Sequence, residues 1–250
     1  MNRKPLLLSV LVLALAVFAA AAWFATGSEP VTMSASDTAA PATTAPRAAA
    51  PMAAASSAAA PKATESRDAA KLPAALQRWY SPILGPAEAP VTIVEFFDPA
   101  CEACRAFYPI VKDIMAKHGN TVRVVLRYTP FHGEASEEAI RVLEAARMQG
   151  VYEPVLEAIL REQPRWAAHG APKAGLVLGI ATAAGLDPDA AKQQMFAPQV
   201  DAVLNQDRAD LQTMGVRQTP TFFVNGRPLN PFGVAEFRAL VAEEVAAAGL

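Results

Sequence analysis

The sequence predicts an α/β domain in which a run of helices separates a strand–helix–strand unit from a final hairpin. Residues 91–97 are almost continuously apolar, which is typical of a strand buried on both faces. Residues 121–128 form a second such segment, and the helical stretch between them implies a right-handed crossover between parallel strands. Farther on, Asn225-Gly226 joins two short segments and is a strong turn sequence for a β-hairpin. Between these β regions, residues from about 134 to 214 show only helical patterns, so we expect a helical insertion there.

The first long helix is expected to begin at Cys101 and to end at Gly119-Asn120. Its apolar residues recur at the spacing of a single helix face, and they are Phe107, Ile110, Val111, Ile114 and Met115. One face of this helix should therefore pack on the sheet, with Cys101 at its N-terminal end.

The remaining elements are expected in the following order. Within the insertion, helices should cover about 135–146, 151–160, 172–184, a segment from 188 onward, and 199–214. Asp187 is a suitable N-cap for the fourth of these, and Pro188 a suitable first-turn residue. After the hairpin, a closing helix should run from about 234 to 248. Pro228 lacks an N–H group, so its strand belongs at the edge of the sheet.

The N-terminal region is predicted to export the rest of the chain. Arg3 and Lys4 precede 21 uncharged residues, so residues 1–26 are either a cleavable signal peptide or an uncleaved membrane anchor. Residues 27–72 are rich in Ala, Pro, Ser and Thr and show no periodicity, so we expect a disordered linker. The folded domain should then occupy residues 73–250. The net charge of −2 gives no electrostatic basis for binding nucleic acid.

Cys101 and Cys104 are the only cysteines, and they lie two residues apart. The ring that they would close is too small to stabilise a fold, so the pair indicates redox chemistry or a metal site. At a helix N-terminus Cys101 should be ionised and nucleophilic, whereas Cys104, one turn farther on, should be the less exposed resolving thiol. A metal site would need further ligands, and the three histidines show no ligand spacing.

Several motifs together resemble the DsbA-like group of thiol:disulfide oxidoreductases, which have a thioredoxin-like fold with an all-helical insertion. Residues 95–104 resemble the active-site strand and helix of that group, and Pro109 matches the proline of its active-site helix. Residues 215–222 resemble the segment that carries the family's cis-proline, and Pro220 lies 116 positions after Cys104. The resemblance covers about residues 76–249 and implies the same fold with the insertion at about 134–214.

The resemblance also implies roles for particular residues. Pro220 should follow a cis peptide bond and face the disulfide, and Thr219 should contact substrate. Glu95 lies inside a strand that reads as buried, so its pKa should be raised and it should carry protons to and from Cys104. The alternative for Glu95 is a strand-end glutamate that reaches solvent or an ion pair.

Two other polar residues near the cysteines are not expected to belong to the site. Asp98 lies in the loop before Cys101, where we expect it to be solvated. His132 lies in the loop after the second strand, and we expect a structural role for it rather than a place on the substrate surface.

The predicted function is a periplasmic thiol:disulfide oxidoreductase, either soluble or anchored to the inner membrane through the N-terminus. Its disulfide Cys101–Cys104 would exchange with cysteines of exported proteins, most simply as an oxidase, with no metal and no other cofactor. A membrane or periplasmic redox partner would recycle the pair. Glu102 and Ala103 replace a dipeptide that favours the thiolate in the family's strong oxidase, so we expect a weaker oxidant. The alternatives are a reductase or isomerase of the same fold, or a periplasmic copper-handling protein.

Overall fold

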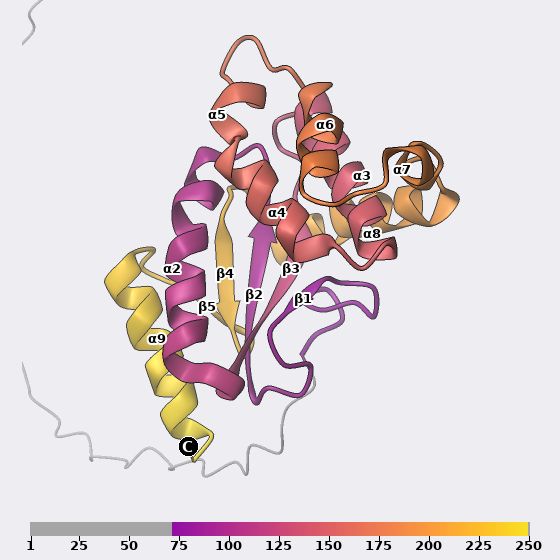
Figure 1. Ribbon diagram of the computed structural model, residues 1–250. Helices are drawn as coiled ribbons and strands as arrows, with labels where there is room; N and C mark the ends of the chain where they lie inside the picture. The colour runs from indigo at the N-terminus through magenta and orange to yellow at the C-terminus, as the bar shows by residue number, and fades with distance from the viewer. Residues whose placement is uncertain (1–71, 250) are drawn as a thin grey trace, which may run out of the picture. The chain divides into compact units, whose positions relative to one another are not determined.

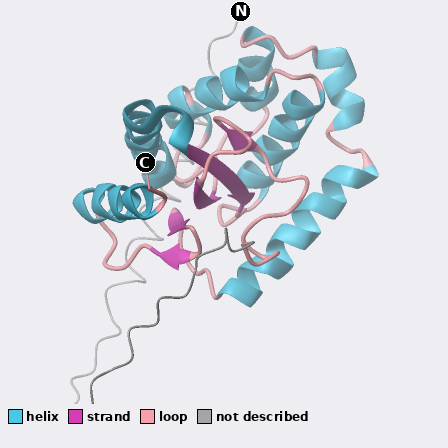
Figure 2. Ribbon diagram, turned by 90° about the horizontal axis from the view of Figure 1, so that it is seen from below, coloured by secondary structure: helices cyan, strands magenta, loops and turns pink. Residues whose placement is uncertain are grey.

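A five-stranded mixed sheet forms the centre of residues 72–249, the part of the chain that the computed structural model describes (Figures 1 and 2). Its strand order is β1-β3-β2-β4-β5, with β2 and β3 parallel and the other neighbouring pairs antiparallel. The strands are β1 (Ile83–Leu84), β2 (Val91–Phe97), β3 (Val122–Tyr128), β4 (Thr221–Val224) and β5 (Arg227–Pro228). The predicted parallel pair and the predicted hairpin are therefore both present, with Pro228 on an edge strand.

Helices lie on both sides of this sheet (Figure 2). Helices α2 (Glu102–His118) and α9 (Val234–Ala247) lie together on one face, and a 3₁₀ turn (Gly119–Thr121) leads from α2 into β3 (Figure 1). The insertion comprises α3 (Glu134–Met148), α4 (Tyr152–Arg161), α5 (Gln163–Trp166), α6 (Leu176–Ala183), α7 (Pro188–Gln194) and α8 (Pro198–Met214). The chain thus has the predicted thioredoxin-like α/β fold with helices inserted between β3 and β4.

The two faces of the sheet have separate apolar cores because successive strand residues point to opposite sides. On the face covered by α2, Ile93 and Phe97 of β2 join the large core that continues into the insertion. On the other face, Val94 and Phe96 pack in a smaller core that includes Leu211 of α8. All seven residues of β2 are buried, as its apolar run predicted.

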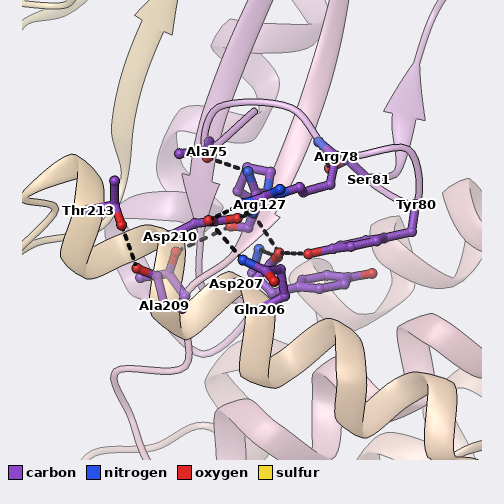
Figure 3. Close-up of polar contacts among 12 residues, drawn as sticks. Ala75, Arg78, Tyr80, Ser81, Arg127, Gln206, Asp207, Ala209, Asp210 and Thr213 are labelled. Carbon is purple, nitrogen blue, oxygen red and sulfur yellow. Dashed lines mark hydrogen bonds and ion pairs between the residues drawn. The ribbon is translucent and has the colours of Figure 1, made fainter. Parts of the chain in front are cut away.

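A buried group of charged residues lies on the second face (Figure 3). The Arg127 side chain has no solvent exposure, and its Nη2 atom donates to Asp207 Oδ1 at 2.7 Å and to Asp210 Oδ2 at 2.6 Å. Arg78 donates to Asp210 Oδ1 at 2.6 Å, and the Tyr80 hydroxyl donates to Asp207 Oδ1 at 2.8 Å. These five residues, hereafter the Arg127 cluster, tie the segment before β1 and helix α8 onto β3.

Some local predictions differ from the structure. Helix α6 begins at Leu176 rather than at Pro172, because the chain between them forms turns in which Leu176 N–H donates to the carbonyl of Lys173. The two-residue strand β1 and the four-residue helix α5 were not predicted, since elements this short leave no periodic pattern. The predicted N-cap is confirmed: the Asp187 side chain accepts from the backbone of Asp189 and Ala190.

None of the helices within residues 72–249 is both long and apolar enough to cross a bilayer. In the same part of the chain, no three histidine, cysteine, aspartate or glutamate side chains are grouped as metal ligands would be. The predicted signal or anchor over 1–26, and the predicted linker apart from its last residue, lie outside the described residues.

Candidate active site

The two cysteines lie at the N-terminal end of α2, beyond the C-terminal end of β2. Cys101 is the N-cap residue, with an extended backbone, and Cys104 lies in the first turn of the helix. Both are free thiols, Cys101 with 7% of its surface exposed and Cys104 with none. The prediction that Cys104 is the less exposed of the two is confirmed.

The surroundings of the two sulfurs favour opposite protonation states. The pKa of Cys101 is lowered to about 5, chiefly by the hydrogen bond from the Cys104 thiol. The Thr219 side chain and the N–H groups of Cys104 and Ala103 add to this effect and outweigh burial, which raises the pKa. The pKa of Cys104 is raised, first by burial and then by its hydrogen bond to Cys101 and by the charge of Glu95. At neutral pH the pair therefore presents one thiolate and one protonated thiol.

The segment before β4 lies against Cys101. The Thr219–Pro220 peptide bond is cis, as predicted, and Pro220 is buried. In the thiol form Cys101 donates to the carbonyl oxygen of Thr219, with Sγ and O 3.3 Å apart. Residues 118 positions apart in the sequence are thus brought into contact at the sulfur.

Glu95 is buried in the middle of β2, on the face covered by α2. Its side chain is 2% exposed, and it takes part in no ion pair among residues 72–249, so the alternative of a solvent-reaching or ion-paired glutamate is wrong. Burial, followed by the charge of Cys101, raises its pKa to about 8. The predicted burial and pKa shift are confirmed, whereas the proton-carrying role remains a prediction. A carboxyl with this pKa can hold or release a proton near neutral pH.

The prediction that Asp98 is a solvated loop residue is wrong. The residue has no exposed surface, and its Oδ2 atom accepts from Phe131 N at 2.8 Å, His132 Nδ1 at 2.7 Å and Ser136 Oγ at 2.9 Å. Its Oδ1 atom accepts from Ala100 N at 2.9 Å. Asp98 therefore links the turn before Cys101 to the segment after β3 by hydrogen bonds. Its backbone N–H also donates to Cys104 Sγ at 3.5 Å. An aspartate followed by proline is a common turn sequence. The pair Asp98-Pro99 was therefore the sequence feature that could have indicated a role for Asp98 in this turn.

His132 and Gln163 also contact this turn. The His132 ring bonds Asp98 while its side chain is 38% exposed, which agrees with the structural role expected for it. Gln163, the first residue of α5, is 1% exposed and donates to the carbonyl oxygens of Pro99 at 2.7 Å and Cys101 at 2.9 Å. Nothing in the sequence around Gln163 indicates this contact, because its partners lie more than 60 positions away.

The fold and this arrangement of cysteines, cis-proline and buried glutamate define the class of DsbA-like thioredoxin-fold proteins. The family model described as thioredoxin (Thioredoxin_4) matches residues 78–243 of the chain. The chain belongs to this thioredoxin family.

Solved structures agree with this assignment. A thioredoxin-like oxidoreductase from Silicibacter pomeroyi DSS-3 is 33% identical, with a TM-score of 0.57, over 67% of this chain and 91% of that one. BdbD from Bacillus subtilis, in its oxidised form, is 26% identical with a TM-score of 0.58, over 66% of this chain and 93% of that one. Alpha-DsbA1 from Wolbachia pipientis shares the fold, with 18% identity, a TM-score of 0.61 and coverage of 69% and 94%.

The curated sequence relatives are named as Na(+)/H(+) antiporters, and they are much longer than this chain. The Na(+)/H(+) antiporter NhaA of Herminiimonas arsenicoxydans is 33% identical over 164 residues, which are 64% of this chain and 25% of the antiporter. NhaA 3 of Salinispora tropica is 30% identical over 172 residues, 67% of this chain and 25% of that protein. The chain thus spans about a quarter of the curated relatives that it matches.

Proposed function

We propose that the protein exchanges a disulfide between Cys101 and Cys104 with cysteine thiols of other proteins. The observation that carries this proposal is the opposite shift of the two thiol pKa values, down at Cys101 and up at Cys104. The thiolate is the reactive species in exchange, so a pair with one thiolate and one buried thiol has a defined nucleophile and a defined resolving group.

In the oxidising direction, a substrate thiolate attacks the sulfur of Cys101. The Cys101–Cys104 bond breaks, the substrate becomes joined to Cys101 in a mixed disulfide, and Cys104 leaves as a thiolate. Because the pKa of Cys104 is raised, this thiolate takes up a proton, and we assign the donor role to Glu95, whose pKa is about 8. A second substrate thiolate then attacks the mixed disulfide at the substrate sulfur and releases Cys101 as a thiolate. The substrate loses two electrons and the protein gains them.

The segment at Thr219 is the proposed place where substrate backbone binds. Its carbonyl oxygen lies 3.3 Å from Cys101 Sγ, so a peptide paired with this segment has its cysteine beside the reactive sulfur. Main-chain hydrogen bonding recognises an extended segment without regard to its side chains, which suits an enzyme with many substrates.

The low pKa of Cys101 favours oxidation of substrates over reduction. A stabilised thiolate lowers the free energy of the reduced form, and the disulfide is then the stronger oxidant. The proposed substrates are exported proteins that contain cysteines, and the proposed location is the periplasm, where the protein is soluble or tethered by its N-terminus. A membrane or periplasmic redox partner would restore the disulfide. Reduction or isomerisation by the same two cysteines is the second candidate.

Two cysteine variants test the exchange reaction. Cys101→Ser removes the nucleophile and should abolish exchange with a dithiol peptide. Cys104→Ala, given a disulfide-bonded peptide, should accumulate a mixed disulfide at Cys101 because the thiol that would resolve it is absent. The equilibrium of the native pair with glutathione gives the direction: a potential closer to about −120 mV than to about −270 mV supports an oxidase. Exchange by Cys101→Ser at the native rate would refute the proposal.

A further inference from the structure

A glutamine of the helical insertion contacts the backbone on both sides of the active-site turn. The Nε2 atom of Gln163 donates to the carbonyl oxygen of Pro99 at 2.7 Å and to that of Cys101 at 2.9 Å. The turn between them is closed by Cys101 N–H, which donates to the carbonyl oxygen of Asp98 at 3.0 Å. A buried side chain 62 positions after Cys101 thus holds the backbone of the proposed nucleophile.

The orientation of this amide is fixed from its other end. Arg105 Nε, on α2, donates to Gln163 Oε1 at 2.9 Å, so the amide oxygen faces the guanidinium and the NH₂ group faces the two carbonyls. An amide NH₂ group has two protons, and each of them has an acceptor here. Gln163 is 1% exposed, so a change of conformation would leave buried polar groups without partners.

These contacts hold two backbone carbonyls next to the Cys101 sulfur, and the carbonyl of Cys101 also accepts from Arg105 N–H at 3.1 Å. With the carbonyls of Pro99 and Cys101 turned toward α5, the N–H groups of Ala103 and Cys104 are directed at the Cys101 sulfur and help to lower its pKa. Asp98 holds the opposite side of the same turn through its bond from Ala100 N–H. The insertion, through Gln163, and the segment after β3, through Asp98, therefore both hold the active-site turn by hydrogen bonds.

We propose that Gln163 is a positioning residue for disulfide exchange: through the carbonyls of Pro99 and Cys101, it holds the reactive sulfur against the N-terminus of α2. This inference rests on the proposed function, since it concerns the same thiol. The other groups that act on that thiol, Cys104 and Thr219 and the backbone of the first turn, are left in place when Gln163 alone is replaced.

Gln163→Met tests this role in the full chain. Methionine has nearly the same length and no hydrogen-bonding NH₂ group, so the turn loses its two bonds while the space stays filled. The pKa of Cys101, measured from the pH dependence of thiolate absorbance, should rise by about one unit. The equilibrium with glutathione should move about tenfold toward the disulfide form, which corresponds to about 30 mV. If the methionine variant does not fold, Gln163→Asn gives the same measurements, because its amide is one methylene too short to reach the turn.

Gln149→Met is the matched control. The amide of Gln149 also joins two parts of the insertion, donating to Asp187 O at 3.1 Å and to Gln194 Oε1 at 2.7 Å, but it contacts neither cysteine nor the turn. This variant should lose stability and keep the native pKa of Cys101. An equal rise in both variants, or no rise in Gln163→Met, overturns the inference.

The wild-type protein separates this inference from the proposed function. If native Cys101 does not ionise below neutral pH and does not exchange, the proposed function fails. If native Cys101 exchanges and Gln163→Met retains the native pKa, only the role of Gln163 fails.

Discussion

The two central strands of the sheet each carry one buried charged residue, and their surroundings differ completely. In the parallel register Glu95 of β2 lies opposite Leu126 of β3, and Phe96 lies opposite Arg127. Glu95 and Arg127 therefore point to opposite faces of the sheet. Glu95 faces α2 and the cysteines, whereas Arg127 faces α8 and the segment before β1.

The two residues differ in whether a counterion is present. Arg127 bonds two aspartates, at 2.7 and 2.6 Å, and its guanidinium lies 5.8 Å from the ring centre of Phe96. Glu95 takes part in no ion pair among the described residues, and burial together with the Cys101 charge raises its pKa to about 8. A charge with partners keeps one protonation state and one geometry. A buried carboxyl without a cation changes protonation state near neutral pH, which is what proton transfer requires.

The largest effect in this comparison is expected from Arg127→Met. Removing one partner of a buried ion pair leaves the other charge uncompensated; here Asp207 would lose its arginine, whereas Asp210 would keep Arg78. The free energy of unfolding should fall by about 3–5 kcal/mol. Urea denaturation of the oxidised protein measures this loss.

Arg123→Met is the control for that variant. Arg123 lies on the same strand and donates to Thr92 Oγ1 at 2.9 Å, to the carbonyl oxygen of Ala87 and to Gln77 Oε1 at 3.4 Å, but it forms no ion pair with an aspartate of α8. Because these partners are neutral and the contacts are partly exposed, its loss should be about 1–2 kcal/mol. If the two arginine variants were equally stable, the Arg127 cluster would not be the stabilising centre described above.

Glu95→Gln should have the opposite effect on stability, and the effect should depend on pH. Between about pH 4.3 and about pH 8, folded Glu95 holds a proton that the unfolded chain has released, so native stability falls as the pH rises through this range. Glutamine does not titrate, so the variant lacks this slope. At about pH 8 it should be more stable than wild type by roughly 2–5 kcal/mol, and at about pH 4 the two should be nearly equal. Urea denaturation of the oxidised proteins, in which neither sulfur titrates and the Cys101 charge is absent, measures the part of this difference that burial of Glu95 causes.

The same variant should exchange disulfides more slowly, by roughly tenfold or more, because no carboxyl supplies the proton to Cys104. Glu88→Gln, at an exposed position before β2, should change neither the pH slope nor the rate. A stability difference that stays constant with pH would show that Glu95 is ionised in the folded protein, and the contrast with Arg127 would then be lost.

The sequence predicted those parts of the site that depend on local pattern and motif order. Cys101 and Cys104 follow an apolar strand, Glu95 is the one charge within that strand, and Pro220 follows a long helical stretch. The parallel strands and the hairpin were predicted because each has a continuous pattern of its own. Arg127 could not be distinguished from Arg123, since both lie on β3 with the same parity, and only the packing of α8 makes one fully buried.

Residues whose role depends on distant partners could not be predicted. Gln163 meets the carbonyls of Pro99 and Cys101 across more than 60 positions, and it lies in a helix of four residues that leaves no periodic pattern. Asp98 was expected to be solvated because loops usually lie at the surface, and here the chain after β3 covers it. Three buried acids thus differ in how they are accommodated: Asp207 by arginine, Asp98 by neutral donors and a histidine, and Glu95 by protonation.

Asp98→Asn tests how the buried Asp98 is accommodated. We expect it to change stability less than Arg127→Met or Glu95→Gln does. The carboxylate accepts four hydrogen bonds, three at Oδ2 and one at Oδ1, and asparagine has only one oxygen. In either orientation of the amide, its NH₂ group faces at least one donor, so the free energy of unfolding should fall by about 1–3 kcal/mol. Asp113→Asn, on the exposed side of α2 and 3.3 Å from Arg238, should stay within about 0.5 kcal/mol of wild type. A loss at Asp98 no larger than at Asp113 would mean that water or a shifted loop replaces these bonds, and that burial of this acid does not fix the turn at Cys101.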